Sequence, residues 1–532
     1  MFLARNKHKQ YIQRMRRGFS ANYASQLHKM SRLRRNLLSN YFGSIWSVIV
    51  QIAFVPFYIR FLGIEQYGLV AFYLTLQATL QILDFGVSPT ISREMARYSV
   101  QPNRADEARD LVRTLEVVYI ALGLVIGLSI VVAAPQIAAH WIKADTLATS
   151  TVQSAVILMG VVFALQWPLS FFTGGLMGLQ RQVLANGLKI TMQTIAGVGA
   201  VLSLWLVSPT IIVFLAWQMV ASALGVILIR FVLWKNLPGL MRAARFKISL
   251  LRNVWRFATG VAGIGIMGLL FSQMDKVIIS AIVDLKVFGY YALAGVVVSG
   301  LFSLSGPVNN TIYPRFSTLI VEGRIETLTK LYFQSFQFLA VLIWPVMVFL
   351  SLFSYEILFL WTRDAEIAQN VAPTVTILVI GTALNCMTVP PYALHLAYGK
   401  TRPIFFILGI EAIIMLPAMI FMTVYYGIIG TAICWVVLNA CYFLALLQTT
   451  NRNSPIQGHL RWYMVNLGRP LAGAIVILGP ARILMPDGEP LYVLSGMLAA
   501  FGMSALIVAY WASPLARSLS AREIWNGIVR QK

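Results

Sequence analysis

The amino-acid sequence predicts an all-α polytopic membrane protein with about fourteen transmembrane helices. Of its 532 residues, 58% are hydrophobic and only 11% are charged, whereas soluble domains carry about 25% charged residues. Apolar runs of about 20 residues, the length that a helix needs to cross a bilayer, recur along the whole chain. These runs are long and continuous, which favours helices over the short alternating strands of a membrane β-barrel.

The apolar runs divide into two groups of six and a final pair. The first group of predicted helices covers residues 37–60, 67–92, 114–134, 151–172, 183–206 and 210–233. The second group covers residues 256–281, 288–313, 331–359, 372–397, 403–425 and 428–449. The final pair covers residues 468–485 and 491–512.

The distribution of basic residues predicts the orientation. Cytoplasmic loops of membrane proteins carry an excess of Lys and Arg. With the N-terminus in the cytoplasm, 36 of the 42 Lys and Arg residues fall on the cytoplasmic side. A miscounted helix early in the chain would swap the sides of every later loop, so this split supports both the helix count and cytoplasmic N- and C-termini. It also accounts for the net charge of +23 without nucleic acid as a partner.

These observations divide the chain into six parts. Residues 1–35 form a basic cytoplasmic tail that membrane lipids with anionic headgroups would attract. Residues 36–235 form an N-terminal six-helix lobe, 236–255 a basic cytoplasmic linker and 256–450 a C-terminal six-helix lobe. Residues 451–512 hold a cytoplasmic loop and two extra helices, and 513–532 form a cytoplasmic tail.

The two six-helix lobes are predicted to be copies of one unit. Tyr67-Gly68, before the second helix, matches Phe288-Gly289 at a shift of 221 residues, and the loop at 178–181 matches the loop at 399–402 at the same shift. Six is an even number, so both copies cross the membrane in the same orientation. That arrangement predicts a pseudo-two-fold axis along the membrane normal and a substrate site between the lobes.

Charged residues inside a bilayer are costly, so each one in a predicted span is a candidate site residue. Asp275 and Lys276 lie in the outer part of the helix at 256–281, beside Gln273. Neighbouring residues point about 100° apart on a helix, so this pair cannot form an ideal contact with each other. We expect both to face a polar lumen and to find partners on another helix or in water.

Other polar residues in the spans have both a functional and a structural interpretation. Asp84 lies where Gly86 and Pro89 interrupt helical hydrogen bonding, and it either faces the lumen or fixes a helix end. Glu411 lies inside the helix at 403–425. Asn309 and Asn310 lie toward the inner end of the helix at 288–313.

Three further features are explained by simpler roles. Glu116 follows Arg113 by three residues, which predicts a local surface pair. Arg93 and Arg315 lie at cytoplasmic helix ends, where lipid headgroups explain them, although either could contact phosphate. One helix carries a run of glycines that allows close helix packing: Gly260, Gly263, Gly265 and Gly268. The alternative is that these glycines form a hinge.

Motifs of enzymes are missing from the sequence. It contains no GxxxxGK[ST] phosphate loop, no HExxH and no GxSxG. The three cysteines, Cys386, Cys434 and Cys441, lie in apolar runs and form no metal-binding pair. We therefore expect neither an enzyme nor a bound metal or cofactor.

Several short motifs resemble the polysaccharide exporter and O-antigen flippase family of the multidrug/oligosaccharidyl-lipid/polysaccharide exporter superfamily. In the first lobe they are the run from Asn36 to Pro56, Phe61-Leu62-Gly63, Tyr67-Gly68 and Leu83-Asp84-Phe85-Gly86. In the second lobe they are Asp275, Gly289-Tyr290-Tyr291, Pro314 and Gly399-Lys400. The resemblance covers most of residues 36–450.

The resemblance implies a V-shaped pair of lobes around a central lumen in the bacterial cytoplasmic (inner) membrane. It implies a flippase that moves an undecaprenyl-diphosphate-linked oligosaccharide to the periplasmic leaflet by alternating access, with H+ or Na+ as possible coupling ions. A polysaccharide polymerase and a chain-length regulator are the implied protein partners. Flippases of the peptidoglycan precursor carry several lumen arginines, whereas only Lys276 is basic in mid-span here, which favours O-antigen, capsule or exopolysaccharide. A proton- or sodium-coupled multidrug antiporter of the superfamily is the alternative.

Overall fold

The structure is a computed structural model that describes residues 2–84, 87–99, 101, 104–238, 243–250, 272–456, 460–485 and 491–512. These residues are almost entirely helical, which confirms the predicted all-α class. The first half of the chain forms α1 (Phe2–Leu80), the 3-10 turn η1 (Gln81–Asp84), α2 (Val87–Tyr98), α3 (Ala105–Gln136), the π turn η3 (Ile137–Trp141), α4 (Thr149–Gln166), α5 (Pro168–Gly178), α6 (Gln182–Leu206) and α7 (Ile211–Asn236).

The second half, from residue 272 onward, is built in the same way. Residues 272–282 are helical and lead into the remaining helices: α9 (Leu285–Val321), α10 (Ile325–Leu352), α11 (Ser354–Thr362), α12 (Ala365–Met387), α13 (Val389–Ala397), α14 (Arg402–Asn453), α15 (Leu460–Ile483) and α16 (Leu491–Ala512). We call α1–α7 the first bundle and residues 272–512 the second bundle.

Two long helices reverse direction at a glycine. The φ angles of Gly63 in α1 and Gly427 in α14 are 74° and 60°, a left-handed conformation that glycine adopts without steric cost. The hydroxyl groups of Thr423 and Thr431 lie 2.6 Å apart, although a straight helix would separate them by about 12 Å along its axis. Each of the two helices is therefore a pair of antiparallel segments.

In α1, the contacts with other helices show the same reversal. Asn40 donates a hydrogen bond of 3.1 Å to Gln182 at the start of α6. Gln66, just after the glycine, accepts a bond of 2.8 Å from the Ile211 amide at the far end of α6, where α7 begins. The chain therefore crosses the bundle before Gly63 and crosses it again afterwards.

The reversals reconcile the observed and predicted numbers of crossings. Eleven helical segments of the described chain are long and apolar enough to span a membrane. Two of them, Phe42–Leu80 and Arg402–Arg452, each contain two crossings, so the eleven segments correspond to thirteen of the fourteen predicted helices. The fourteenth, near residues 256–281, is described only from Ser272 onward.

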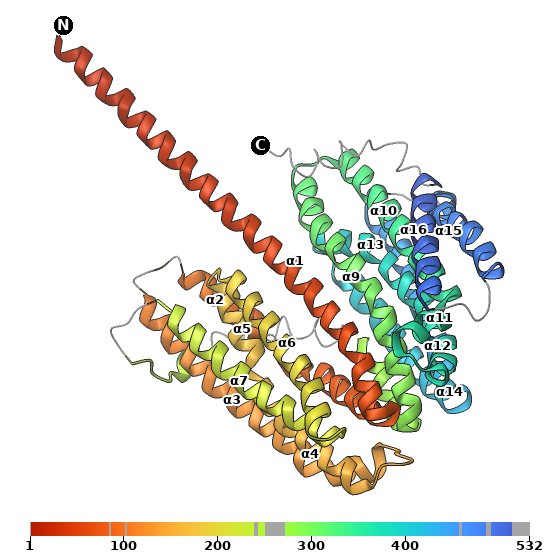
Figure 1. The fold of residues 1–532 in the computed structure, drawn as a ribbon. Coiled ribbons are helices and arrows are strands. Elements are labelled where there is room, and N and C mark those ends of the chain that lie inside the picture. Colours follow the sequence, from red (N-terminus) through yellow and green to blue (C-terminus); the bar gives the residue numbers. More distant parts are fainter. Residues whose placement is uncertain are drawn as a thin grey trace.

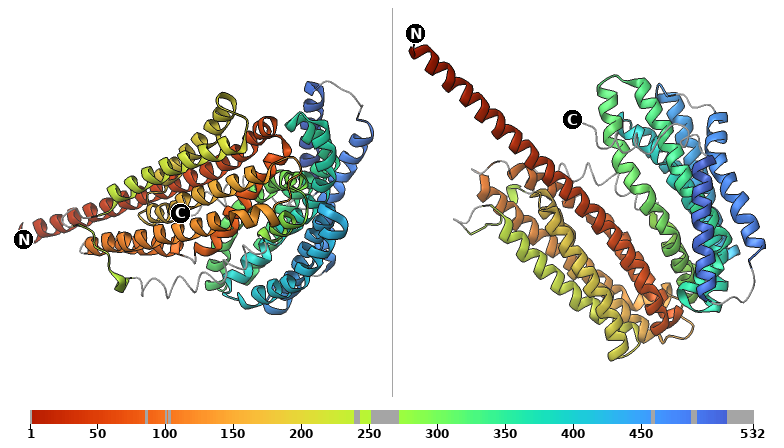
Figure 2. Two further views of the ribbon diagram at one scale, coloured as in Figure 1. Left: turned by 90° about the horizontal axis from the view of Figure 1, so that it is seen from below. Right: turned by 45° about the horizontal axis from the view of Figure 1, so that its top comes forward.

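The two bundles converge at one end and separate toward the other (Figure 1, Figure 2). We call the joined end, which includes residues 63–68, 141–146 and 280–289, the closed end. There the backbone amide of Leu285 donates a bond of 2.7 Å to the Lys143 carbonyl, and Lys143 Nζ reaches the carbonyl of Ile282 at 2.8 Å. Helices α1 and α9 pack along each other and form the main contact between the bundles.

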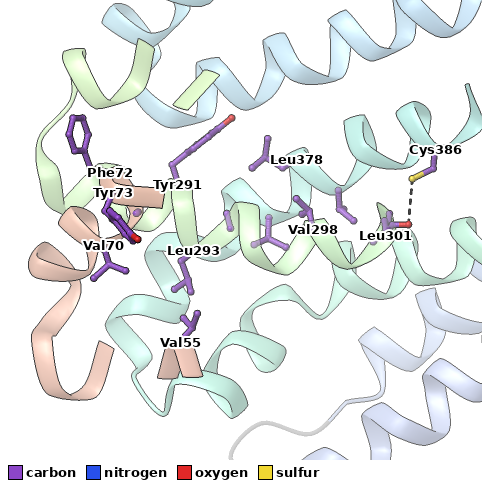
Figure 3. Packing of buried hydrophobic residues seen from close by; sticks show 14 of the residues in the cluster. Val55, Val70, Phe72, Tyr73, Tyr291, Leu293, Val298, Leu301, Leu378 and Cys386 are labelled. Carbon is purple, nitrogen blue, oxygen red and sulfur yellow. Dashed lines mark hydrogen bonds between the residues drawn. The ribbon is translucent and has the colours of Figure 1, made fainter. Parts of the chain in front are cut away.

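Apolar side chains of both bundles form one buried cluster beside this contact (Figure 3). Val55, Val70 and Phe72 come from α1, whereas Leu293 and Val298 come from α9. The extra helices α15 and α16 pack against α10, on the outside of the second bundle (Figure 1). The joint between the bundles therefore depends on the helices of the predicted repeat and not on the final pair.

The contact between α1 and α9 is reciprocal. A Cβ atom on Gly289 would lie 2.7 Å from the carbonyl oxygen of Ile64, and one on Gly68 would collide with the carbonyl oxygen of Leu285. Gly289 follows Gly68 by 221 residues, and Leu285 follows Ile64 by the same number. Gly68 contacts Leu285, and its counterpart Gly289 contacts Ile64, which is the counterpart of Leu285. This symmetric pair of contacts supports the predicted repeat and two-fold axis.

The helix boundaries repeat at the same offset. Helix α4 gives way to α5 at Trp167, and α12 gives way to α13 at Thr388, which is 221 residues later. The predicted limits of the lobes and of the linker at 236–255 stay predictions, because much of the linker lies outside the described residues.

Candidate functional site

A cavity of about 420 Å³ lies between the two bundles. One wall comes from α1, and the others come from residues 272–276 and from α9, α12 and α14. Its polar lining combines side chains from both bundles: Gln51, Thr75, Ser272, Gln273, Asp275, Lys276, Ser299 and Thr382. The structure thus brings together Gln273, Asp275 and Lys276, three of the residues that the sequence predicted as a site.

Asp275 is held firmly in the wall of this cavity. It is 7% exposed, and its Oδ2 accepts a hydrogen bond of 2.8 Å from the hydroxyl of Tyr291 on α9. Its Oδ1 has no hydrogen-bond partner among the residues that the structure describes. Oδ1 has almost no exposed surface, and a buried acceptor that lacks a partner costs free energy, so the described chain leaves this carboxylate incompletely satisfied.

Lys276 lies beside this carboxylate but does not use it fully. Its Nζ is 3.7 Å from Asp275 Oδ1, which is within ion-pair range but too long for a hydrogen bond. The same Nζ donates a bond of 3.2 Å to the carbonyl of Ser272. An ammonium group has three donors, so Lys276 keeps donors for an anion in the cavity.

Tyr291 is a candidate site residue that was not singled out from the sequence. It stood in a motif of the resemblance, and its hydroxyl carries no charge that would mark it in a span. Figure 3 shows the long side chain of Tyr291 on α9, next to the contact between the bundles. The sequence predicted that Asp275 has a partner on another helix. That prediction did not identify Tyr291 as the partner.

The other predicted site residues do not line this cavity. The carboxylate of Asp84 accepts bonds from the hydroxyl (2.8 Å) and the backbone amide (3.3 Å) of Ser88, so it fixes the start of α2. Asn309 has a buried Oδ1 without a partner in the described chain, and Asn310 beside it on α9 is exposed.

Glu411 is buried alone in α14. It is 8% exposed, and neither of its carboxylate oxygens has a hydrogen-bond partner in the described part of the chain. Its burial without a partner sets it apart from Asp275 and Asp84, whose oxygens accept hydrogen bonds. A carboxyl group in such a place is costly, which makes Glu411 a candidate site residue.

The candidate phosphate contacts and hinges lie away from the cavity or outside the described chain. Arg93 is exposed on α2, and Arg315 is half-buried on α9. Neither contributes to the lining of the cavity between the bundles. The four glycines between residues 260 and 268 lie outside the described residues, so their hinge role stays a prediction.

The predicted surface pair of Glu116 is wrong in one respect. Glu116 does pair with Arg113, at 3.1 Å, but its side chain is fully buried. The reason is a second cation, Arg230 on α7, which contacts the same carboxylate together with the indole of Trp234. The sequence separation between α3 and α7 hid this partner.

A second acidic residue of α3 binds the chain that leaves the first bundle. Asp110 accepts a bond of 2.8 Å from the backbone amide of Arg245 and pairs with Lys247 Nζ at 2.8 Å. Thr114, one turn further along α3, accepts the backbone amide of Lys247 at 2.9 Å. The segment at 243–247 is therefore fixed to the first bundle.

Comparisons with known proteins agree with this architecture. Residues 33–320 match the family model described as "Polysaccharide biosynthesis protein". A protein of Shigella flexneri named "Putative O-antigen transporter" is 20% identical over 402 residues, which are 75% of this chain and 93% of that protein.

Two solved structures share the fold. One is "Lipid II flippase MurJ, inward closed conformation", with a TM-score of 0.65 and 11% identity over 89% of this chain and 98% of that chain. The other is an inward-facing multidrug resistance MATE family transporter of the MOP superfamily, with a TM-score of 0.63 and 12% identity over 76% of this chain and 94% of that chain. At these identities the likeness concerns the fold alone.

Proposed function

Because this chain belongs to the polysaccharide biosynthesis protein family, we propose that it is a flippase for a lipid-linked oligosaccharide. Its substrate would be an undecaprenyl-diphosphate-linked oligosaccharide that moves from the cytoplasmic to the periplasmic leaflet during synthesis of a surface polysaccharide. The observation that carries this proposal is the polar cavity between the bundles, in which Lys276 and Asp275 meet. The name of the Shigella relative supports the same substrate class.

The physical problem of such a substrate matches the architecture. Sugars and a diphosphate cannot cross hydrocarbon without losing their hydrogen bonds to water. A cavity lined by hydroxyl, amide and charged groups replaces part of that water, while the polyprenyl tail stays in the lipid between the helices. Bundles that are joined at one end can alternate the side on which the cavity opens, as in other transporters built from repeats.

Lys276 and Asp275 would divide the work in this cavity. The Lys276 ammonium would bind the diphosphate through its remaining donors. Asp275, held by Tyr291, would accept a bond from a sugar hydroxyl through Oδ1 or would bind a coupling cation. Glu411 is the second candidate for coupling to H+ or Na+, because its carboxyl is buried without a partner.

The setting of the protein follows from the same proposal. The chain would lie in the inner membrane of a bacterium with both termini in the cytoplasm, as the distribution of basic residues predicts. The end at which the bundles separate would then face the cytoplasm, where the lipid-linked substrate is made. A polysaccharide polymerase and a chain-length regulator would act on the product after it has crossed.

A complementation experiment tests the proposal. The gene is deleted from its host, surface polysaccharide is measured, and Lys276→Ala is compared with the control Lys330→Ala, which changes an exposed lysine at the start of α10. We expect deletion to abolish export, Lys276→Ala to reduce it at least tenfold, and the control to restore it. Normal polysaccharide in the deletion strain together with sensitivity to hydrophobic cations would instead identify a multidrug antiporter.

A further inference from the structure

A second cavity, of about 600 Å³, lies inside the first bundle. Its walls come from the second segment of α1 with η1 and from α4, α5, α6 and α7. Five glutamines contribute to its lining, together with three hydroxyl groups: Gln77, Gln81, Gln166, Gln193, Gln218, Ser170, Thr173 and Ser222. Its lining residues in the described chain include one cation, Lys189, which is exposed, and no carboxylate.

Part of this amide cluster has a structural role. The Gln77 amide donates to Gln166 Oε1, and the Gln166 amide donates a bond of 2.8 Å to the hydroxyl of Ser222. Gln193 accepts a bond of 2.9 Å from the hydroxyl of Ser47. Polar side chains commonly hold membrane helices together in this way, and these bonds connect α1, α4, α6 and α7.

The cluster nevertheless contains more hydrogen-bonding groups than the packing uses. Gln218 is half-buried and Gln81 is exposed. Both line the same cavity, and the side chain of neither bonds to another described residue. A polar group inside a membrane protein is costly when it has no partner. Helix packing alone does not explain why the half-buried position 218 carries an amide instead of an apolar residue.

The chemistry of the lining indicates the ligand. An amide side chain offers a donor and an acceptor at the same end, and a sugar hydroxyl both donates and accepts. A lining of neutral amides and hydroxyls bonds to such a ligand without burying a charge. We propose that this cavity binds uncharged sugar residues of the oligosaccharide headgroup, an inference that rests on the proposed function.

The position of the cavity fits a headgroup that is held at two places. The second segment of α1 contributes to the lining of both cavities. Residues 71, 74, 75 and 78 of that segment line the cavity with Lys276, whereas Gln77 and Gln81 line the second cavity. The diphosphate would lie in the charged cavity and the sugars in the amide cavity, with this single helix contributing to both.

Binding measurements on the full-length protein in nanodiscs test the inference. Two probes are compared: undecaprenyl diphosphate, and the undecaprenyl-diphosphate-linked oligosaccharide extracted from the host cells. Gln218→Leu removes an amide that makes no bond within the described chain, so the bundle should stay folded. The control is Gln136→Leu, which changes an exposed glutamine at the end of α3.

We expect Gln218→Leu to weaken binding of the sugar-bearing lipid about tenfold, the loss of one or two good hydrogen bonds. Binding of undecaprenyl diphosphate should stay within about twofold of that of the control. Gln166→Leu should show the same difference between the two lipids, with a lower melting temperature because it also breaks the helix network. Lys276→Ala should weaken binding of both lipids.

Two outcomes would overturn the inference while the proposed function stands. One is an unchanged affinity of Gln218→Leu and Gln166→Leu for the sugar-bearing lipid. The other is an equal loss for both lipids, which would mean that the amides do not recognise sugar. Failure of the wild-type protein to bind either lipid would instead overturn the proposed function, and the inference with it.

Discussion

Tyr291 donates a hydrogen bond of 2.8 Å to Asp275 across two helices of the second bundle. This bond orients the carboxylate in the cavity between the bundles and leaves its other oxygen, 3.7 Å from Lys276 Nζ, without a hydrogen bond in the described chain. The Tyr291 hydroxyl, which was named from the sequence only as part of a motif, thus orients the Asp275 carboxylate of the predicted charge pair.

Tyr291→Phe should impair export more than it impairs folding. The substitution removes one hydroxyl and leaves the buried carboxylate of Asp275 without its donor, which costs about 1–3 kcal/mol. We expect a lower melting temperature in detergent and a clear loss of surface polysaccharide. Tyr313→Phe, on an exposed part of the same helix, is the control, and equal export by the two variants would contradict the role of Tyr291.

Gly68→Ala should disrupt the joint between the bundles. The new methyl group would collide with the backbone carbonyl of Leu285, which cannot move aside as a side chain can. We expect less folded protein and a loss of export, and a similar result for Gly289→Ala. Gly306→Ala in α9, where nothing lies within 4 Å of the new atom, should behave like the wild type. A stable and active Gly68→Ala protein would show that the close approach is not needed.

Glu116→Ala should destabilise the first bundle strongly. The substitution removes a fully buried carboxylate that joins α3 to α7 through Arg113 and Arg230. The two arginines stay partly exposed to solvent, so we expect a cost of about 1.5–3 kcal/mol, that of losing hydrogen bonds to a charged group. The matched change is Glu107→Ala, at the start of the same helix as Glu116. It breaks an exposed pair with Arg104 and should cost about 0–1 kcal/mol. Thermal unfolding of both variants measures the difference, and equal melting temperatures would refute it.

Glu411→Gln should separate folding from ion coupling. The amide has nearly the same shape and removes the cost of a charge that has no partner, so the melting temperature should not fall. If Glu411 carries a coupling proton or sodium ion, transport in proteoliposomes should lose its response to an imposed ion gradient. A variant that keeps the wild-type gradient response would exclude Glu411 as the coupling residue.

The sequence was sufficient to predict the helical class and the crossings, because the length of an apolar run has a direct physical meaning in a bilayer. The positions of Asp275 and Lys276 were also predictable, since a charge in a span is rare. The repeat was detectable from Tyr67-Gly68 and Phe288-Gly289 because close backbone contact allows few residues other than glycine at those sites.

Partnerships between distant helices could not be predicted from the sequence. Glu116 and Arg230 lie on different helices. The local pair with Arg113 already explained why Glu116 could lie in a span, so nothing in the sequence indicated a second partner. The glutamine-lined cavity was missed for a similar reason. Gln77, Gln166 and Gln218 are isolated neutral residues in apolar runs, and only the folded bundle brings them to one place.

The contacts at Gly68 and Gly289 have the form of an isologous dimer interface. In a symmetric homodimer, a contact of one residue with a second on the partner is always matched by its reverse. Here a single polypeptide carries both halves of such an interface, as if two copies of an ancestral subunit had been joined end to end. Joining frees the copies to diverge: Phe54 stands 221 residues before Asp275, and Val298 stands 221 residues after Gln77. The charge pair of Asp275 and Lys276 therefore belongs to one copy, whereas amides are present in both, at Gln218 and at its counterpart Asn439. Identical subunits could not differ in their charges in this way.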